Sequence, residues 1–117
     1  MNFSTKVKQN VFFVRYEGDL IGPEQNEDLN RLIEEQIAAG VLACAIDISE
    51  VRYINSTGIA MLLVLLTRFR NKGGEVLLIN PSQHVQKLLI ITKLNAIFTI
   101  VSSEQEAIDT LLKINKQ

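Results

Sequence analysis

The sequence has little cysteine, no excess of charge of either sign and no long apolar run. Its single cysteine, Cys44, cannot form an internal disulfide, and without a second cysteine a zinc site has little support. Lys and Arg number 12 against 13 Asp and Glu, so the clustered positive charge with which proteins bind nucleic acids is missing. We therefore expect neither a metal site nor a nucleic-acid partner.

The apolar runs are too short for a membrane anchor. The longest, residues 59–66, has eight residues, whereas a helix that spans a bilayer needs about 20. The first residues lack the apolar core and the cleavage site of a signal peptide, so we expect a cytoplasmic protein without membrane insertion. Two self-sufficient cores rarely fit into fewer than about 150 residues. Because no linker or repeat divides the chain either, residues 1–117 are expected to form a single domain.

Signatures of enzymes are also missing. The sequence contains neither G-x-G-x-x-G nor G-x-x-x-x-G-K-[ST], the glycine patterns that hold dinucleotides and triphosphates. The only histidine, His84, falls in the exposed first turn of a predicted helix, where we expect a solvated side chain rather than a general base. Cys44 lies inside an apolar strand and is expected to be a small buried thiol. We predict no catalytic residue and no cofactor.

Strand-like and helix-like apolar patterns alternate along the chain. The first predicted elements are a β-hairpin of residues 3–7 and 11–16 and a helix that Gly22-Pro23 begins and Gly40 ends. The others are a strand over 41–48, a helix over 59–72, a strand over 75–79, a helix that Asn80-Pro81-Ser82 begins, a strand over 97–101 and a helix after Ser103, which has a capping-box spacing to Glu106. This order, β-β-α-β-α-β-α-β-α, predicts an α/β fold with a mainly parallel central sheet and an antiparallel N-terminal hairpin.

In such a fold, functional residues are expected in the loops at the carboxyl ends of the strands. Asp47 ends an apolar strand and is predicted to accept hydrogen bonds in the following turn. Further along, Asn55, Ser56 and Thr57 are all good N-cap residues, so spacing alone favours a simple helix start. The functional alternative is a phosphorylation site. A phosphate carries about −1.5 to −2 charges, and at a helix N-terminus it meets free N–H groups and a favourable dipole.

Residues 47–59, which read DISEVRYINSTGI, resemble the signature of STAS-domain anti-sigma factor antagonists, D-[LFM]-S-x-V-x-[FY]-[IM]-D-S-[ST]-G-[LI]. The likeness covers nearly the whole chain. It includes the order of the elements, Gly73-Gly74 before the fourth strand, the helix start at Pro81 and a terminal helix after Ser103. The resemblance implies a single STAS-like domain that acts as a binder and a kinase substrate and is not itself an enzyme.

The function that this resemblance implies is partner switching in bacteria. The unphosphorylated antagonist binds an anti-sigma factor with a GHKL-type serine kinase fold, which then releases its client. Phosphorylation of the antagonist abolishes binding, and a PP2C-type phosphatase restores the unphosphorylated form. The family motif places the phosphate on Ser56, with Thr57 as the second choice. We expect a monomer, since nothing in the sequence requires a dimer.

The resemblance and the predicted fold together define a candidate partner-binding set. Its members all lie in or near the two loops that the family uses for contact: Asp19, Asn55, Ser56, Thr57, Gly58 and Met61. The chain departs from the family pattern at Asn55, where the family commonly has Asp, and in residues 18–23, where it commonly has G-E-[LI]-D. Met61, Leu62 and Leu65 cannot be divided between core and interface from the sequence, and the core is the plainer interpretation of each.

Two other functions stay open. One is a structural STAS subunit of a lipid-transport ABC complex, in which Ser56 and Thr57 would serve only as helix-cap or contact residues. The departure at Asn55 keeps this alternative open, whereas the otherwise complete motif favours the antagonist. The other is a nucleotide-binding or enzymatic domain of flavodoxin-like appearance, which no glycine-rich loop or acid/base pair supports.

Overall fold

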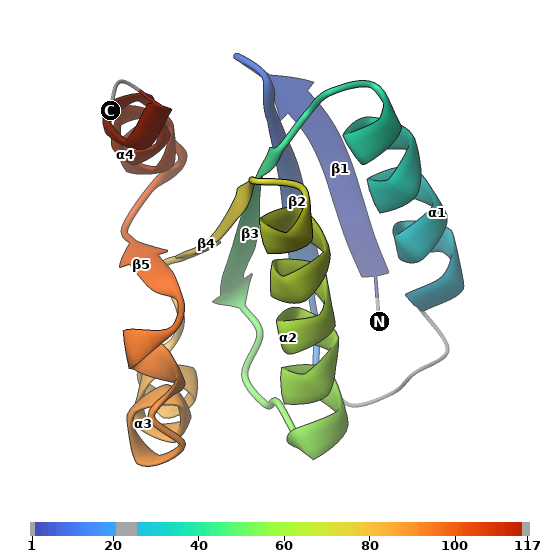
Figure 1. Ribbon diagram of the computed structural model, residues 1–117. Helices are drawn as coiled ribbons and strands as arrows, with labels where there is room; N and C mark the ends of the chain where they lie inside the picture. Colours follow the sequence, from blue (N-terminus) through green and yellow to red (C-terminus); the bar gives the residue numbers. More distant parts are fainter. Residues whose placement is uncertain (1, 21–25, 116–117) are drawn as a thin grey trace.

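The computed structural model describes residues 2–20 and 26–115 (Figure 1). Its strands are β1 (Asn2–Lys8), β2 (Val11–Glu17), β3 (Ala43–Glu50), β4 (Glu75–Ile79) and β5 (Thr99–Val101). Its helices are α1 (Asn26–Ala38), α2 (Ser56–Asn71), α3 (Gln83–Ile91) and α4 (Glu104–Asn115), with a short 3-10 helix, η1 (Leu94–Ala96), after α3. The predicted order of strands and α-helices is confirmed.

The five strands form one sheet in the order β1-β2-β3-β4-β5. β1 and β2 are the predicted antiparallel hairpin, and the β2–β3, β3–β4 and β4–β5 pairs are parallel. The crossover helices between parallel strands bring the carboxyl ends of β2, β3 and β4 to the same edge of the sheet. The predicted α/β class with a mainly parallel sheet is therefore confirmed. The loops at this edge are those in which the site is predicted.

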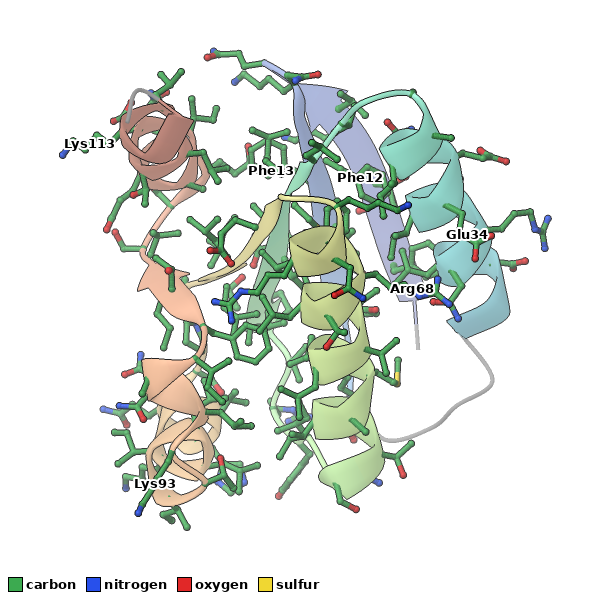
Figure 2. The ribbon with its side chains drawn as sticks, viewed as in Figure 1. Phe12, Phe13, Glu34, Arg68, Lys93 and Lys113 are labelled. Atoms are coloured by element: carbon green, nitrogen blue, oxygen red, sulfur yellow. The ribbon has the colours of Figure 1, made fainter. Side chains whose placement is uncertain are left out.

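Helices cover both faces of the sheet. Side chains of α1, α2 and α3 join Phe12, Val14 and Tyr16 of β2 in the larger core on one face. Side chains of α4 join Val11 and Phe13 in a smaller core on the other face. Figure 2 shows this alternation along β2, with Phe12 on the side of α1 and Phe13 on the side of α4. Because both faces are covered, β3 and β4 need the nearly continuous apolar sequence from which they were predicted.

Some boundaries differ from those predicted. The helix expected to begin at residue 59 begins at Ser56, because the Asn55 side chain caps it. The strand expected over 41–48 is β3 (Ala43–Glu50), which continues to pair with β2 beyond a bulge. The strand expected over 97–101 is shortened to β5, because η1 and the turn after it occupy residues 94–98. The helix start predicted at Gly22-Pro23 lies outside the described residues.

Within the described residues, no helix is long and apolar enough to cross a membrane. Over the same part of the chain, no group of three or more His, Cys, Asp and Glu side chains is placed to hold a metal ion.

Candidate partner-binding surface

Three chain segments meet at the carboxyl edge of the sheet, each following one of the neighbouring strands β2, β3 and β4. The Leu20 N–H donates to the Tyr53 carbonyl at 2.9 Å, and the Asn55 N–H donates to the Leu20 carbonyl at 3.4 Å. These bonds make a short parallel bridge between Leu20 and Ile54. From the third segment, the Ser82 hydroxyl donates to the Val51 carbonyl at 3.1 Å. The segment that leads into α2 is therefore held from both sides.

Helix α2 begins at this edge of the sheet, where Asn55 is its N-cap. Asn55 has an extended backbone, and its Oδ1 accepts the Gly58 N–H at 2.9 Å. The Ile59 N–H donates to the Asn55 carbonyl at 2.9 Å, which closes the first helical turn. The Asn55 side chain thus satisfies the Gly58 N–H, one of the amides that a helix N-terminus leaves without a partner, and the Asn55 carbonyl accepts the first regular helical bond. The N-cap role predicted for this stretch belongs to Asn55.

Gly58 is required for close packing. A Cβ atom at this position would lie 2.1 Å from the Leu20 carbonyl oxygen and 2.8 Å from Ile54 Cγ1. The first of these contacts is with backbone, which cannot move away as a side-chain tip can. The glycine of the sequence motif therefore lets α2 start directly against the Leu20 segment, and it brings the loop after β2 beside Ser56.

Ser56 and Thr57 occupy the first two positions of α2, and both are exposed. Neither hydroxyl makes a hydrogen bond within the described part of the chain. All of α2 is described, and its first turn carries no acidic residue. Two accessible hydroxyl groups therefore lie at the positive end of the α2 dipole. An added negative group would be electrostatically favoured there.

The structure brings together most of the predicted partner-binding set. Asp19 is partly buried and precedes Leu20, which pairs with the Tyr53–Asn55 segment, so both predicted contact loops lie at one edge. Met61 is different: it is 6% exposed and packs in the larger core. Leu62 and Leu65 are buried there too, as the plainer interpretation had it. Met61 as a partner contact stays a prediction, and its burial gives it little surface to offer.

Three other sequence predictions are tested here. The Asp47 carboxylate accepts hydrogen bonds from the Ser49 N–H at 2.9 Å and the Ser49 hydroxyl at 2.6 Å, which confirms its role in the following turn. Cys44 is fully buried, which confirms the predicted small buried thiol, and this burial raises the pKa of the thiol. His84 is exposed in the first turn of α3, as expected.

The sequence did not single out Tyr53, although the structure leaves its side chain 58% exposed three residues before Ser56. Its ring meets that of His84 edge-on, with the centroids 5.4 Å apart and the planes at 70°. The available signal was the alternation in Tyr53-Ile54-Asn55, where the buried Ile54 requires its neighbours to point outward. We call the partly buried Asp19 and the exposed Asn55, Ser56 and Thr57 the switch surface; Tyr53 and His84 adjoin it.

Two hollows among the described residues lie away from the switch surface. One, of about 430 Å³, is at the amino end of the sheet, between the β1–β2 turn, Gly73-Gly74 and α4. Another, of about 450 Å³, lies between α1 and α2, where Arg68 Nη1 and Glu34 Oε1 are 3.5 Å apart across the groove (Figure 2). Neither is lined by a residue of the switch surface.

Comparisons with known proteins agree with this architecture. BtrV of Bordetella bronchiseptica, which is named for a proposed role as an anti-sigma factor antagonist, is 26% identical over 81 residues, covering 69% of this chain and 70% of BtrV. The unphosphorylated form of the anti-sigma factor antagonist SpoIIAA has 22% identity and a TM-score of 0.80, over 96% of this chain and 97% of SpoIIAA. Its phosphorylated form, from Bacillus, has 22% identity and a TM-score of 0.73, over 93% and 98% of the two chains.

A Thermotoga maritima protein, also described with a proposed antagonist role, has 21% identity and a TM-score of 0.81, and the match covers 93% of each chain. These structures share the fold of this protein. The family model of the STAS domain matches residues 2–107, nearly the whole chain, which confirms the resemblance seen in the sequence. The chain belongs to the STAS domain family.

Proposed function

We propose that this protein is an anti-sigma factor antagonist that works by partner switching. In its unphosphorylated form it binds an anti-sigma factor with a GHKL-type serine kinase fold through the switch surface, and the anti-sigma factor releases its client. Phosphorylation on Ser56 ends the binding. A PP2C-type phosphatase removes the phosphate and returns the protein to its binding form.

The observation that carries the proposal is the placement of Ser56. Its hydroxyl is exposed and makes no hydrogen bond to the described residues, so a kinase can reach it without local unfolding. The surrounding backbone is held by the Leu20 bonds, the Asn55 cap and the Ser82–Val51 bond. A firmly held acceptor hydroxyl suits both recognition by a kinase and contact with a partner. The antagonist role proposed for BtrV, and the unphosphorylated and phosphorylated forms of SpoIIAA, support the same proposal.

The chain supplies only the acceptor in the proposed phosphoryl transfer. The Ser56 oxygen attacks the γ-phosphorus of ATP, the bond from that phosphorus to the β–γ bridging oxygen breaks, and ADP leaves. The hydroxyl proton passes to a base of the kinase. In the phosphatase reaction, water attacks the phosphorus and the bond from phosphorus to the Ser56 oxygen breaks. Inorganic phosphate leaves, and the serine oxygen takes up a proton. The protein therefore needs no catalytic group of its own.

Phosphorylation changes the charge of the surface more than its shape. The phosphate adds about −1.5 to −2 charges at the positive end of α2, where the helix dipole favours it. Because Asn55 already caps the helix, the phosphate does not have to replace a structural hydrogen bond of Ser56. The domain can therefore keep its fold, while a partner surface that meets uncharged Ser56 and Thr57 would have to desolvate a dianion. This penalty explains how one phosphate can end the binding.

The proposal can be tested by affinity capture from lysate of the source cell with three baits: wild type, Ser56→Asp and Ser56→Ala. We expect wild type and Ser56→Ala to retain a GHKL-fold serine kinase, identified by mass, and Ser56→Asp to lose it. Incubation with this kinase and ATP should add phosphate to wild type and not to Ser56→Ala. Equal recovery of an ABC ATPase by all three baits would contradict the proposal and favour a structural STAS subunit. Phosphate on Ser56→Ala would move the assignment to Thr57.

A further inference from the structure

Tyr53 is a large aromatic side chain left exposed at the edge that carries Ser56. The chain is extended from Tyr53 to Asn55, with Ile54 bridged to Leu20 and 93% of its surface buried (7% exposed). In an extended segment, residues two apart point to the same side. The side chains of Tyr53 and Asn55 therefore share the outward side, about 7 Å apart along the chain. Ser56 follows directly, so the ring adjoins the switch surface.

The ring is held by α3. His84 meets it edge-on at 5.4 Å between centroids, a geometry that is favourable for aromatic rings. The first turn of α3 is in turn fixed by Ser82, whose hydroxyl donates to the Val51 carbonyl at 3.1 Å and accepts the Val85 N–H at 3.4 Å. Ser82 thus links α3 to the segment that contains Tyr53. This link restricts the ring before any partner arrives.

We propose that Tyr53 is an anchor of the partner interface, that its ring enters an apolar recess of the anti-sigma factor, and that His84 is a positioning residue for that ring. The inference rests on the proposed function and extends its surface across α3. Tyrosine is enriched among the few residues that dominate binding energy, because a stiff ring buries much area at little conformational cost. A ring that is already oriented loses still less freedom on binding.

Because Tyr53 is continuous with the switch surface, the anti-sigma factor is the partner expected to cover its ring. The Cα atoms of Tyr53 and Ser56 are three residues apart, at most about 11 Å along the chain, so a partner that covers Ser56 also reaches the ring. A phosphate on Ser56 would stand at the rim of the recess that takes Tyr53. There, desolvation would penalise the new charge more than at an open surface. The anchor therefore sharpens the response to a single phosphate.

The test is a set of dissociation constants, measured by isothermal titration calorimetry with the purified kinase that the wild-type bait recovers. Because truncation of an interface anchor lowers affinity by a factor of about 30, we expect Tyr53→Ala to weaken binding at least about tenfold. Tyr53→Phe should stay within about threefold of wild type, since it keeps the ring. Ile91→Ala, which truncates a 77% exposed side chain at the other end of α3, is the matched control and should bind as wild type does.

The positioning role of His84 has its own readout. His84→Ala should weaken binding about threefold, and His84→Phe, which restores an aromatic edge, should recover it. Melting temperatures near that of wild type would show that all these variants fold. Binding by Tyr53→Ala within about twofold of wild type, with binding lost in Ser56→Asp, would overturn the inference and leave the proposed function standing. Recovery of no kinase, or equal binding by Ser56→Asp, would overturn both. An effect of His84→Ala that His84→Phe does not repair would overturn the positioning role.

Discussion

Two helix starts in this protein use the same kind of cap and leave very different surfaces. At α4, the Ser103 hydroxyl accepts the Glu106 N–H at 3.1 Å, and the Glu106 carboxylate accepts the Ser102 hydroxyl as well as the Ser102 N–H at 3.2 Å. Glu104, also in the first turn, pairs with Lys6 at 2.9 Å. At α2, the Asn55 side chain caps the helix, and the first turn of this wholly described helix has no acidic residue.

The difference concerns how the positive end of each helix dipole is used. The carboxylates of α4 already neutralise it from within the chain, and its serines are engaged in hydrogen bonds. The first turn of α2 has its cap but no acidic residue, and its two hydroxyl groups are exposed. One start is built for stability, and the other is stable while staying able to accept an anion. A hydroxyl at the α2 start can therefore be modified without dismantling the cap.

The largest expected effect comes from disturbing the close approach of Gly58, at the start of α2, to the Leu20 carbonyl. Gly58→Ala places a Cβ against the Leu20 carbonyl, and overpacking of this kind costs about 3 kcal/mol. Urea denaturation should show this loss in the free energy of unfolding, with Thr57→Ala, one position away and exposed, changed by less than about 0.5 kcal/mol. A Gly58→Ala protein as stable as wild type would mean that α2 and the Leu20 segment are not packed together.

The two starts can be compared directly with the same substitution. Ser103→Ala removes the N-cap acceptor of α4 and should cost about 1 kcal/mol of unfolding free energy. Ser56→Ala removes a hydroxyl without hydrogen bonds to the described residues and should cost less than about 0.5 kcal/mol. Chemical denaturation of both variants tests the contrast. Equal losses of unfolding free energy in the two variants would show that the Ser56 hydroxyl contributes to the cap of α2.

Adding a negative charge to the open start should stabilise it in a salt-dependent way. Asn55→Asp keeps a cap acceptor for the Gly58 N–H and adds a charge beside the dipole, which stabilises by about 0.5 kcal/mol at low ionic strength. Thermal unfolding at low salt and at about 1 M salt should differ more for Asn55→Asp than for wild type, because salt screens this interaction. If the difference in melting temperature between Asn55→Asp and wild type did not change with salt, the added charge would not interact with the dipole of α2.

The smallest expected effect concerns the start of α4, where the stability that Glu106 contributes should depend on pH. Hydrogen bonds from the Ser102 hydroxyl and then the Ser102 N–H lower the pKa of the Glu106 carboxyl, since they favour its charged form. A carboxyl whose pKa is lower in the folded than in the unfolded state stabilises the fold above its ordinary pKa, and this stabilisation is lost as the pH falls through the folded value. The difference in melting temperature between wild type and Glu106→Gln should therefore shrink below about pH 4.

A matched carboxylate keeps that experiment specific. Glu35 is exposed on α1 and makes no ion pair within the described residues, so Glu35→Gln should leave the pH profile of wild type unchanged. If the Glu106→Gln difference were the same at pH 3 and pH 7, the Ser102 bonds would not be retained in solution.

Much of the fold followed from the sequence, because local chemistry and tertiary packing agree there. The apolar run that became β3 is covered on both faces, and Ser82 caps α3 as its place after Pro81 indicated. The start of α2 was expected three residues too late, at Ile59. Apolar periodicity begins at Ile59, whereas the helix begins where the Asn55 side chain satisfies the Gly58 N–H. Caps are local hydrogen bonds and leave only a weak pattern in hydrophobicity.

The candidate site was predictable where it depends on the motif and not where it depends on packing between segments. Ser56 and Asn55 could be named from their order along the chain. The capping box at Ser103 formed only in part, because the Glu106 carboxylate reaches back to Ser102 instead of Ser103. The contact of Tyr53 with His84 joins residues 31 positions apart, since it depends on how α3 docks beside the β3 loop. Sequence periodicity carries no information on such a contact.

The most direct test of the central claim is to locate the phosphate. Purified protein is incubated with the recovered kinase and ATP, and the modified residue is identified by tandem mass spectrometry in wild type, Ser56→Ala and Thr57→Ala. The account predicts one phosphate on Ser56 in wild type and in Thr57→Ala, none in Ser56→Ala, and loss of kinase binding by the phosphorylated protein. Phosphate on another residue, or a phosphorylated protein that still binds the kinase as tightly, would contradict it.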